Sequence, residues 1–130
     1  HDLAVPGSRA NVDHLVIGPT GVWVVDTKAY RARVTARWGR VSVGGVPLST
    51  APVRWEASVV AEVLGRKTRP IIAIHARGLP RRGRRLDGVR VLPAERLVRR
   101  LRRGRYLWPS LRAGEVRKLA ELAEARLARP

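Results

Sequence analysis

The sequence predicts a small domain with a mixed β-sheet flanked by helices, in the α/β or α+β class. Short strand-like segments bounded by turn signals fill the first part of the chain, and segments with helical spacing of apolar residues follow. Among these lies the apolar run Ile71–Ile74, which is typical of a strand buried on both faces. A length of 130 residues suits one modest hydrophobic core. We therefore expect a single domain over residues 1–130.

The first part of the chain predicts several short strands. Their expected limits are His1–Pro6, Asn11–Ile17, Val22–Thr27, Val34–Trp38 and Arg40–Val43. Val22–Thr27 is rich in β-branched and aromatic residues, so it predicts a buried strand. The turn signal Gly18-Pro19-Thr20-Gly21 directly precedes this strand. A hairpin is therefore expected between the strands on either side of these glycines.

The rest of the chain predicts helices and two further strands. A helix is expected from Pro52 to Gly65, because apolar residues recur at helical spacing between a proline start and a glycine end. The other expected elements are the strands Ile71–His75 and Gly88–Leu92, the helices Ala94–Arg103 and Arg112–Leu127, and a charged loop at Arg81–Arg85. Strands followed by helix, strand, strand and helix favour a mixed sheet.

The charge of the chain points to a polyanionic partner. Lysine and arginine number 27 against 10 acidic residues, which gives a net charge of +17. Because 45% of the residues are hydrophobic, the chain can bury a core and is not a disordered polycation. Arginine dominates, and its planar guanidinium suits phosphate. A genome rich in G and C would raise arginine content without any ligand, but it would not remove acids. A nucleic acid is therefore the expected partner.

The composition also excludes several classes of site. Cysteine is absent, so the chain forms neither disulfides nor thiolate zinc sites. No apolar run approaches the roughly 20 residues that span a bilayer, and no signal peptide is visible. We therefore expect a cytoplasmic protein without a membrane partner. The chain starts at His1, directly before a strand-like segment, so we expect it to be part of a longer protein.

The most informative residues are two acids and a lysine around the glycine turn. If the turn closes a symmetric hairpin, paired residue numbers sum to 39, so Asp13 lies opposite Asp26. Cross-strand partners have Cβ atoms roughly 4.5–5.5 Å apart on the same face of the sheet. Lys28 shares this face because strand side chains alternate. The hairpin alone therefore predicts a cluster of two carboxylates and one ammonium.

This cluster suits metal-assisted hydrolysis of a phosphodiester. Two close carboxylates repel unless a cation compensates them, and Mg²⁺ or Mn²⁺ prefers oxygen ligands. The ammonium of Lys28 would orient or deprotonate the attacking water, or stabilise the charged phosphate. A purely structural interpretation stays open, in which Lys28 pairs with one acid and the other acid lies at the sheet edge. A bulged turn would also shift the register by one residue.

These residues carry a family resemblance. The segments Ser8–Pro19, with Asp13, and Gly21–Tyr30, with Asp26-Thr27-Lys28, resemble the nuclease-related (NERD) domain. The resemblance is closest over residues 1–45. The family is assigned to the PD-(D/E)xK, restriction-endonuclease-like superfamily, so the resemblance implies that fold and Mg²⁺- or Mn²⁺-dependent nuclease activity. It implies Asp13 and Asp26 as metal-binding acids and Lys28 as the catalytic lysine. It also implies that the backbone carbonyl of Thr27 binds the metal.

The chain departs from the family pattern in two places. The family carries a glutamate on a helix before the first strand, and this chain begins after that point. We therefore expect the domain to lack its N-terminal helix. The family also has a glutamine shortly after a proline at the start of the central helix, where this chain has Trp55 after Pro52. Glu56 is the neighbouring polar residue at this place.

Arginines after the motif and in the charged loop are the expected nucleic-acid contacts. They are Arg31, Arg33, Arg81, Arg82, Arg84 and Arg85. Trp38, Trp55 and Trp108 are expected in the core rather than as stacking platforms for bases.

The expected function is hydrolysis of phosphodiester bonds by a Mg²⁺- or Mn²⁺-dependent nuclease-like domain, with DNA rather than RNA as partner. Two alternatives stay open. One is a non-catalytic nucleic-acid-binding module with the same fold, and the other is a basic domain that binds an acidic protein. The sequence leaves the oligomeric state open.

Overall fold

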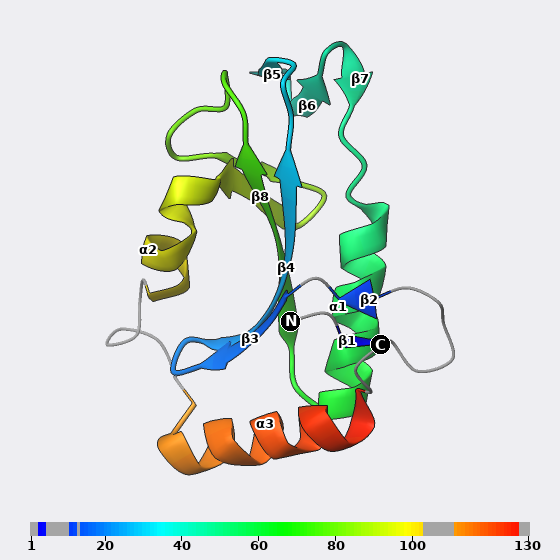
Figure 1. Ribbon diagram of the computed structural model, residues 1–130, viewed down its shortest axis with the longest axis vertical. Coiled ribbons are helices and arrows are strands. Elements are labelled where there is room, and N and C mark those ends of the chain that lie inside the picture. Colours follow the sequence, from blue (N-terminus) through cyan, green and yellow to red (C-terminus); the bar gives the residue numbers. More distant parts are fainter. Residues whose placement is uncertain (1–2, 5–10, 13, 103–110, 128–130) are drawn as a thin grey trace.

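The computed structural model describes residues 3–4, 11–12, 14–102 and 111–127 (Figure 1). Its centre is a five-stranded sheet with the order β3-β4-β8-β10-β9. The strands are β3 (His14–Gly18), β4 (Gly21–Ala29), β8 (Thr68–His75), β10 (Val89–Pro93) and β9 (Arg84–Leu86). β4, β8 and β10 are parallel, and an antiparallel strand lies at each edge. The predicted class, a mixed sheet flanked by helices, is confirmed.

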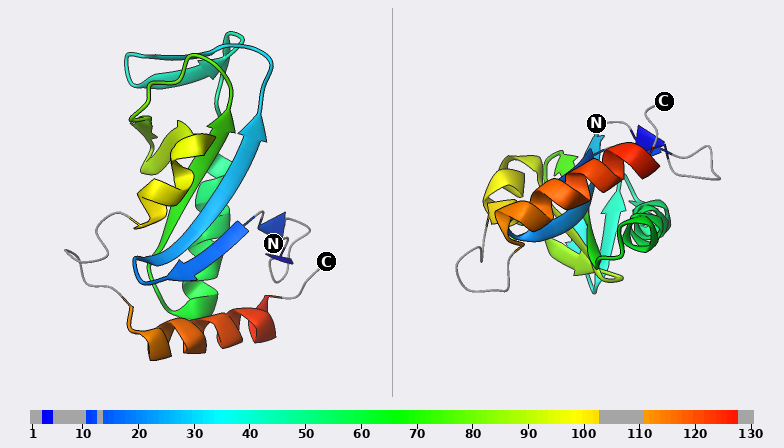
Figure 2. Two further views of the ribbon diagram at one scale, coloured as in Figure 1. Left: turned by 60° about the vertical axis from the view of Figure 1, so that its left-hand side comes forward. Right: turned by 90° about the horizontal axis from the view of Figure 1, so that it is seen from below.

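Helices cover both faces of this sheet. They are α1 (Ala51–Leu64), the short 3₁₀ helix η1 (Ala94–Arg96), α2 (Leu97–Arg102) and α3 (Ala113–Arg126). The sheet lies between α1 on one face and α2 on the other, as the two views in Figure 2 show. α3 packs across one end of the molecule, against α1 and β3. No helix in the described ranges is long and apolar enough to cross a membrane.

Two smaller groups of strands complete the structure. β5 (Val34–Arg37), β6 (Arg40–Val43) and β7 (Val46–Pro47) form a separate antiparallel sheet beyond the end of β4 (Figure 1). β1 (Leu3–Ala4) pairs with β2 (Asn11–Val12). The strand expected over Asn11–Ile17 therefore corresponds to β2 and β3, and the residue between them, Asp13, lies outside the described residues.

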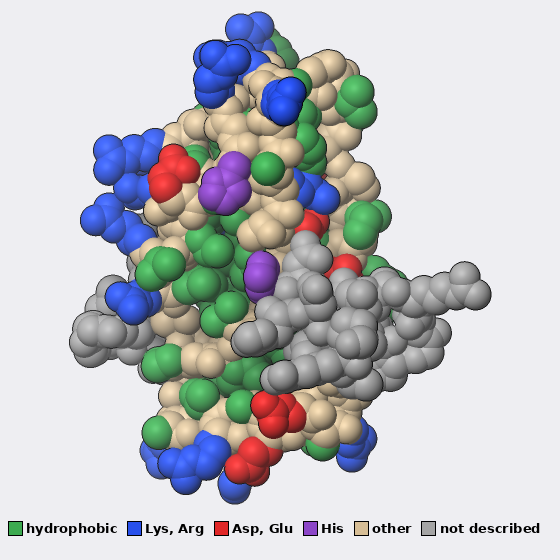
Figure 3. All heavy atoms as spheres, in the orientation of Figure 1, with side chains coloured by type: hydrophobic (Ala, Val, Ile, Leu, Met, Phe, Trp, Pro, Cys, Tyr) green, Lys and Arg blue, Asp and Glu red, His purple; other side chains and the backbone are tan. Residues whose placement is uncertain are grey.

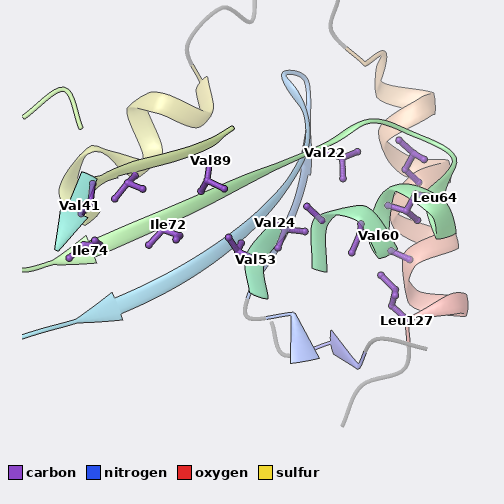
Figure 4. Packing of buried hydrophobic residues seen from close by; sticks show 14 of the residues in the cluster. Val22, Val24, Val41, Val53, Val60, Leu64, Ile72, Ile74, Val89 and Leu127 are labelled. Atoms are coloured by element: carbon purple, nitrogen blue, oxygen red, sulfur yellow. The ribbon is translucent and has the colours of Figure 1, made fainter. Parts of the chain in front are cut away.

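The alternation of side chains along β4 divides the core between the two faces of the sheet. Val22 and Val24 face α1, where they pack with Val53 and Val60 (Figure 4). Ile72 and Ile74 of β8 belong to the same cluster. The intervening Trp23 and Val25 belong to a second cluster, with Ile71, Ala73 and Leu92 and the partly buried Leu97 and Leu101. The Ile71–Ile74 run is therefore buried on both faces, as its uniform apolarity predicts.

α1 begins and ends at the residues that the sequence indicates. Pro52 lies in its first turn. Backbone N–H groups there make no hydrogen bond within the helix, so the lack of an N–H in proline costs the helix nothing. Gly65 ends the helix with φ of 65°, a left-handed conformation that glycine adopts without strain. Val53, Ala57, Val60 and Leu64 are the buried face. Because these residues are spaced three and four apart, they form one apolar face of α1, which packs against the sheet. This packing places the first turn of α1 beside the end of β4.

Three expectations need correction. The segment Arg81–Arg85 is not a loop throughout, because Arg84–Leu86 pairs with β10 as the edge strand β9. Such a charged edge strand lacks the apolar alternation that predicts strands. Trp38 and Trp55 are not core residues, since their exposed fractions are 94% and 45%. Trp108 lies outside the described residues.

Candidate functional site

Asp26 and Lys28 lie in the second half of β4, on the face of the sheet that α1 covers. Their side chains alternate in step with Val22 and Val24, which pack against α1. Asp26 pairs with Ile72 and Lys28 with Ile74 in the parallel ladder to β8. The buried part of β4 ends at Val25, and intermediate and exposed residues alternate after it. Both charged groups therefore lie at the border between the core and solvent.

The two side chains form an ion pair. Lys28 Nζ lies 3.1 Å from Asp26 Oδ2. The side chains are 32% and 16% exposed, respectively, so both charges are partly removed from water. An ionised carboxylate in this position needs a charged partner or a bound cation. The ammonium of Lys28 supplies that charged partner here.

A cavity of about 280 Å³ opens beside Lys28. Tyr30 lines it next to Lys28, Val46 and Leu48 contribute from β7 and the segment after it, and Pro52 closes it from the first turn of α1. Three separate parts of the fold therefore meet at the lysine. The arrangement leaves room for a ligand on the side of Lys28 that faces the small sheet.

The register of the β3–β4 hairpin is the predicted one. His14 pairs with Val25 and Ile17 with Val22, so every described pair sums to 39. The residue before His14 is Asp13, which the structure does not describe. β2, on the other side of Asp13, also lies against β4. The symmetric hairpin is confirmed over β3, and the pairing of Asp13 with Asp26 stays a prediction that continues this register.

Thr27 alternates to the other face of β4, and its side chain is exposed. It pairs with Ala73 of β8. The described pairing with β3 ends at Val25, so from Asp26 onward β8 is the sheet neighbour that the structure describes for β4. A ligand role for Thr27 through its backbone carbonyl would therefore not depend on its side chain.

Within the described ranges, no group of three or more histidine, aspartate or glutamate side chains is placed to hold a metal ion. Mg²⁺ does not require such a cage, because it keeps several waters and binds through one or two carboxylates plus substrate phosphates. Asp26, partly exposed and paired with the cavity-lining Lys28, fits that donor set. The second carboxylate expected for it, that of Asp13, lies outside the described residues.

The predicted nucleic-acid contacts do not form one surface. Arg31 and Arg33 are exposed in the segment between β4 and β5. Arg81, Arg82, Arg84 and Arg85 are also exposed, but they belong to β9 and the loop before it. Arg81 and Arg82 line a cavity on the face that carries α2, opposite the face of Asp26 and Lys28. Contact of these arginines with a nucleic acid stays a prediction.

Arg90 is a basic residue of this second face that was not among the predicted contacts. Arg90 stands in β10 between the buried Val89 and Val91, and its side chain emerges on the opposite face from theirs. An arginine inside an otherwise apolar strand is a signal that the sequence already contained. The close approach of Arg90 to residues of α2 depends on the packing of two separate elements.

Comparison with known proteins decides the family. A family model described as the nuclease-related domain (NERD) matches residues 1–75. The chain belongs to this family. The nuclease-related domain is placed in the PD-(D/E)xK superfamily, in agreement with the mixed sheet and its helices. The matched segment includes Asp13, Asp26, Lys28 and the whole of α1. No curated protein and no solved structure matches the chain.

Proposed function

We propose that this nuclease-related domain hydrolyses phosphodiester bonds in DNA, with Mg²⁺ or Mn²⁺ as cofactor. The observation that carries the proposal is the Asp26–Lys28 pair at the end of a buried strand, in a hairpin whose described pairs run from Gly18–Gly21 to His14–Val25. A carboxylate and an ammonium on one strand face, with the ammonium beside a cavity, would supply the acid–lysine half of a phosphodiesterase site.

Each residue has a distinct role in this proposal. The carboxylates of Asp13 and Asp26 and the backbone carbonyl of Thr27 would hold the cation. The cation, when bound, supplies charge compensation for the phosphate oxygens and lowers the pKa of water. Lys28 donates hydrogen bonds from its ammonium to the attacking water or to a phosphate oxygen. Because the side chain of Lys28 is 32% exposed and borders a cavity, it reaches a ligand without disturbing the core.

The substrate class follows from charge. With a net charge of +17, the chain attracts a polyanion from a distance, and the attraction falls with ionic strength. Arg31 and Arg33 follow the end of β4, on the same strand end as Asp26 and Lys28. Their guanidinium groups suit phosphates that flank the bond to be cleaved.

The decisive experiment replaces Asp26 by asparagine in the intact protein. Asp26→Asn keeps the size of the side chain and removes its charge, so Mg²⁺-dependent cleavage of labelled DNA should be lost and metal binding by calorimetry should weaken. Glu121→Gln, an exposed acid on α3, is the matched control and should leave both unchanged. Persistent cleavage by Asp26→Asn at the normal rate would refute the assignment.

A non-catalytic nucleic-acid-binding module is the second candidate. It is favoured by the direct pairing of Lys28 with Asp26, which already compensates the carboxylate without a metal. This function predicts DNA retention with a steep salt dependence, equal in EDTA and in Mg²⁺, and no cleavage. The same assays therefore distinguish the two candidates.

A further inference from the structure

A basic groove lies on the face of the sheet that carries α2. Two adjoining cavities of about 280 Å³ and 420 Å³ share Arg90 and Arg100 in their walls. We call this region the arginine groove and define it by Arg69, Arg81, Arg90, Arg96, Arg99 and Arg100. Figure 3 shows Lys and Arg side chains along the edge of the molecule that α2 occupies. The sheet separates the groove from Asp26 and Lys28.

The fold brings these arginines together from four helices and strands and one loop. Arg69 extends from β8, Arg90 from β10, and Arg81 from the loop before β9, while η1 and α2 supply the remaining three. Leu97 and Leu101 pack on the buried apolar residues of this face, so α2 is held against the sheet. Thr20 Oγ1 also donates a hydrogen bond to the carbonyl of Leu101 and ties the β3–β4 turn to α2. The groove is therefore a built feature of the tertiary structure.

The positively charged side chains in the groove repel one another. Arg90 pairs directly with Arg85 in the β9–β10 ladder, and like charges in such positions are destabilising. The pKa of Arg96 is lowered, first by desolvation and then by the charges of Arg81 and Arg99. Glu95 is a nearby acid that acts in the other direction. Positive charge thus exceeds negative charge at this place, which favours an anionic ligand.

Arg90 of the groove carries a buried donor that no described residue satisfies. The Nε atom of Arg90 is buried, and the described part of the chain offers it no hydrogen-bond acceptor. A buried donor without an acceptor costs free energy. Arg90 itself lines both cavities, so a small rotation of its guanidinium would let this donor bond to a phosphate oxygen bound in the groove.

We propose that the arginine groove binds the phosphate backbone of a nucleic acid, at a site separate from Asp26 and Lys28. That the anion is a nucleic acid, rather than another polyanion, rests on the proposed function. Trp23 lies beneath the guanidinium of Arg69, with 5.0 Å between Arg69 Cζ and the ring centroid, and is only 3% exposed. Its ring is therefore closed to base stacking, so the groove contacts phosphates and reads no sequence.

The test compares two double variants of the intact protein that lose the same charge. Arg81→Gln with Arg99→Gln removes two exposed guanidiniums from the groove, and Arg117→Gln with Arg126→Gln removes two from α3. Binding of a labelled DNA duplex is measured in EDTA across a salt series. Each lost phosphate contact reduces the magnitude of the slope of log K against log salt by about 0.9. For the groove variant, which loses two, the magnitude of the slope should therefore be smaller by about 1.8. The α3 variant should lose much less.

Equal losses in both double variants would overturn the proposal, because net charge alone would then explain binding. Absence of DNA binding by the unaltered protein would overturn it as well. The outcome is independent of catalysis, since EDTA prevents cleavage. A selective loss in the groove variant supports the groove even if the unaltered protein cleaves nothing in Mg²⁺. Conversely, cleavage that depends on Asp26, together with equal losses in both double variants, leaves the nuclease proposal standing and refutes the groove.

Discussion

Lys28 Nζ lies 3.1 Å from Asp26 Oδ2, two residues away along one strand and on the same face of the sheet. Pairs of fully exposed side chains contribute only about 0–1 kcal/mol to the free energy of unfolding, but these two side chains are only 32% and 16% exposed. Two neutral residues would be less costly to bury at this end of the apolar part of β4. Stability alone therefore does not explain the pair, and removing one partner leaves the other charge partly buried.

Lys28→Ala should reduce Mg²⁺-dependent DNA cleavage by about 10²-fold or more, the usual effect of removing a group that transfers or orients a proton. The free energy of unfolding should also fall, by about 1–3 kcal/mol, because the Asp26 carboxylate, with a side chain only 16% exposed, loses its charged partner. Single-turnover cleavage and thermal unfolding measure the two effects. Lys118→Ala, which removes an exposed lysine of α3, is the matched control and should cleave normally. A Lys28→Ala protein that cleaves as fast as Lys118→Ala would contradict the role of the ammonium.

Asp13→Asn should weaken Mg²⁺ binding about as strongly as Asp26→Asn. The described pairs of the β3–β4 hairpin sum to 39, and continuing that register places Asp13 opposite Asp26. The measurement is isothermal calorimetry with Mg²⁺ and with Mn²⁺. Asp87→Asn, at the β9–β10 turn, serves as a control acid and should bind metal normally. Metal binding that Asp13→Asn leaves intact would show that the register does not continue to this residue.

Trp38→Asn should raise the free energy of unfolding by about 1 kcal/mol. Trp38 and Gly39 form the two-residue turn between β5 and β6, with φ of 54° and 70°. A turn with two positive φ values favours Asn-Gly, because asparagine tolerates the left-handed region better than an aromatic residue. The indole is 94% exposed, so its removal loses little packing.

Chemical denaturation of Trp38→Asn and Trp38→Ala separates conformation from side-chain loss. Alanine also removes the indole, but it adopts the left-handed backbone conformation less readily than asparagine does. The explanation fails if the two variants are equally stable.

Gly83→Ala should destabilise the domain by well over about 1 kcal/mol. Gly83 has φ of +70°, and an added Cβ would lie 2.2 Å from the carbonyl oxygen of Val91. Gly88→Ala is the matched control, because Gly88 has φ of +78° but open space around the added Cβ. Its cost should be only the conformational one, about 1 kcal/mol. Equal unfolding free energies for the two variants would contradict the steric argument.

Much of the hairpin and of α1 was predictable because the relevant signals are local. The glycine turn placed Ile17 opposite Val22, and the described ladder has this register. The proline start, the spacing of Val53, Ala57, Val60 and Leu64, and Gly65 together define α1. Period and turn chemistry depend on neighbours within a few residues, so they can be read without a three-dimensional structure.

The exposure of Trp38 and the edge strand Arg84–Leu86 were not predictable in the same way. Tryptophan is normally a buried residue type, and its exposure depends on where a hairpin points relative to the rest of the fold. Arg84–Leu86 becomes a strand because β10 offers it an unpaired edge. In both cases, contacts with distant segments decide the outcome.

The sequence by itself determined the class of fold, the ends of α1 and the placement of Asp26 and Lys28 on one strand face. Alternation along a strand and the 3.6-residue period of a helix are properties of the local backbone. Only the tertiary structure decided that Arg90 of β10 meets Arg96, Arg99 and Arg100 on the face opposite Lys28. These arginines come together because α2 packs against the sheet. The spacing of charged residues within one element does not predict which residues of another element lie beside them.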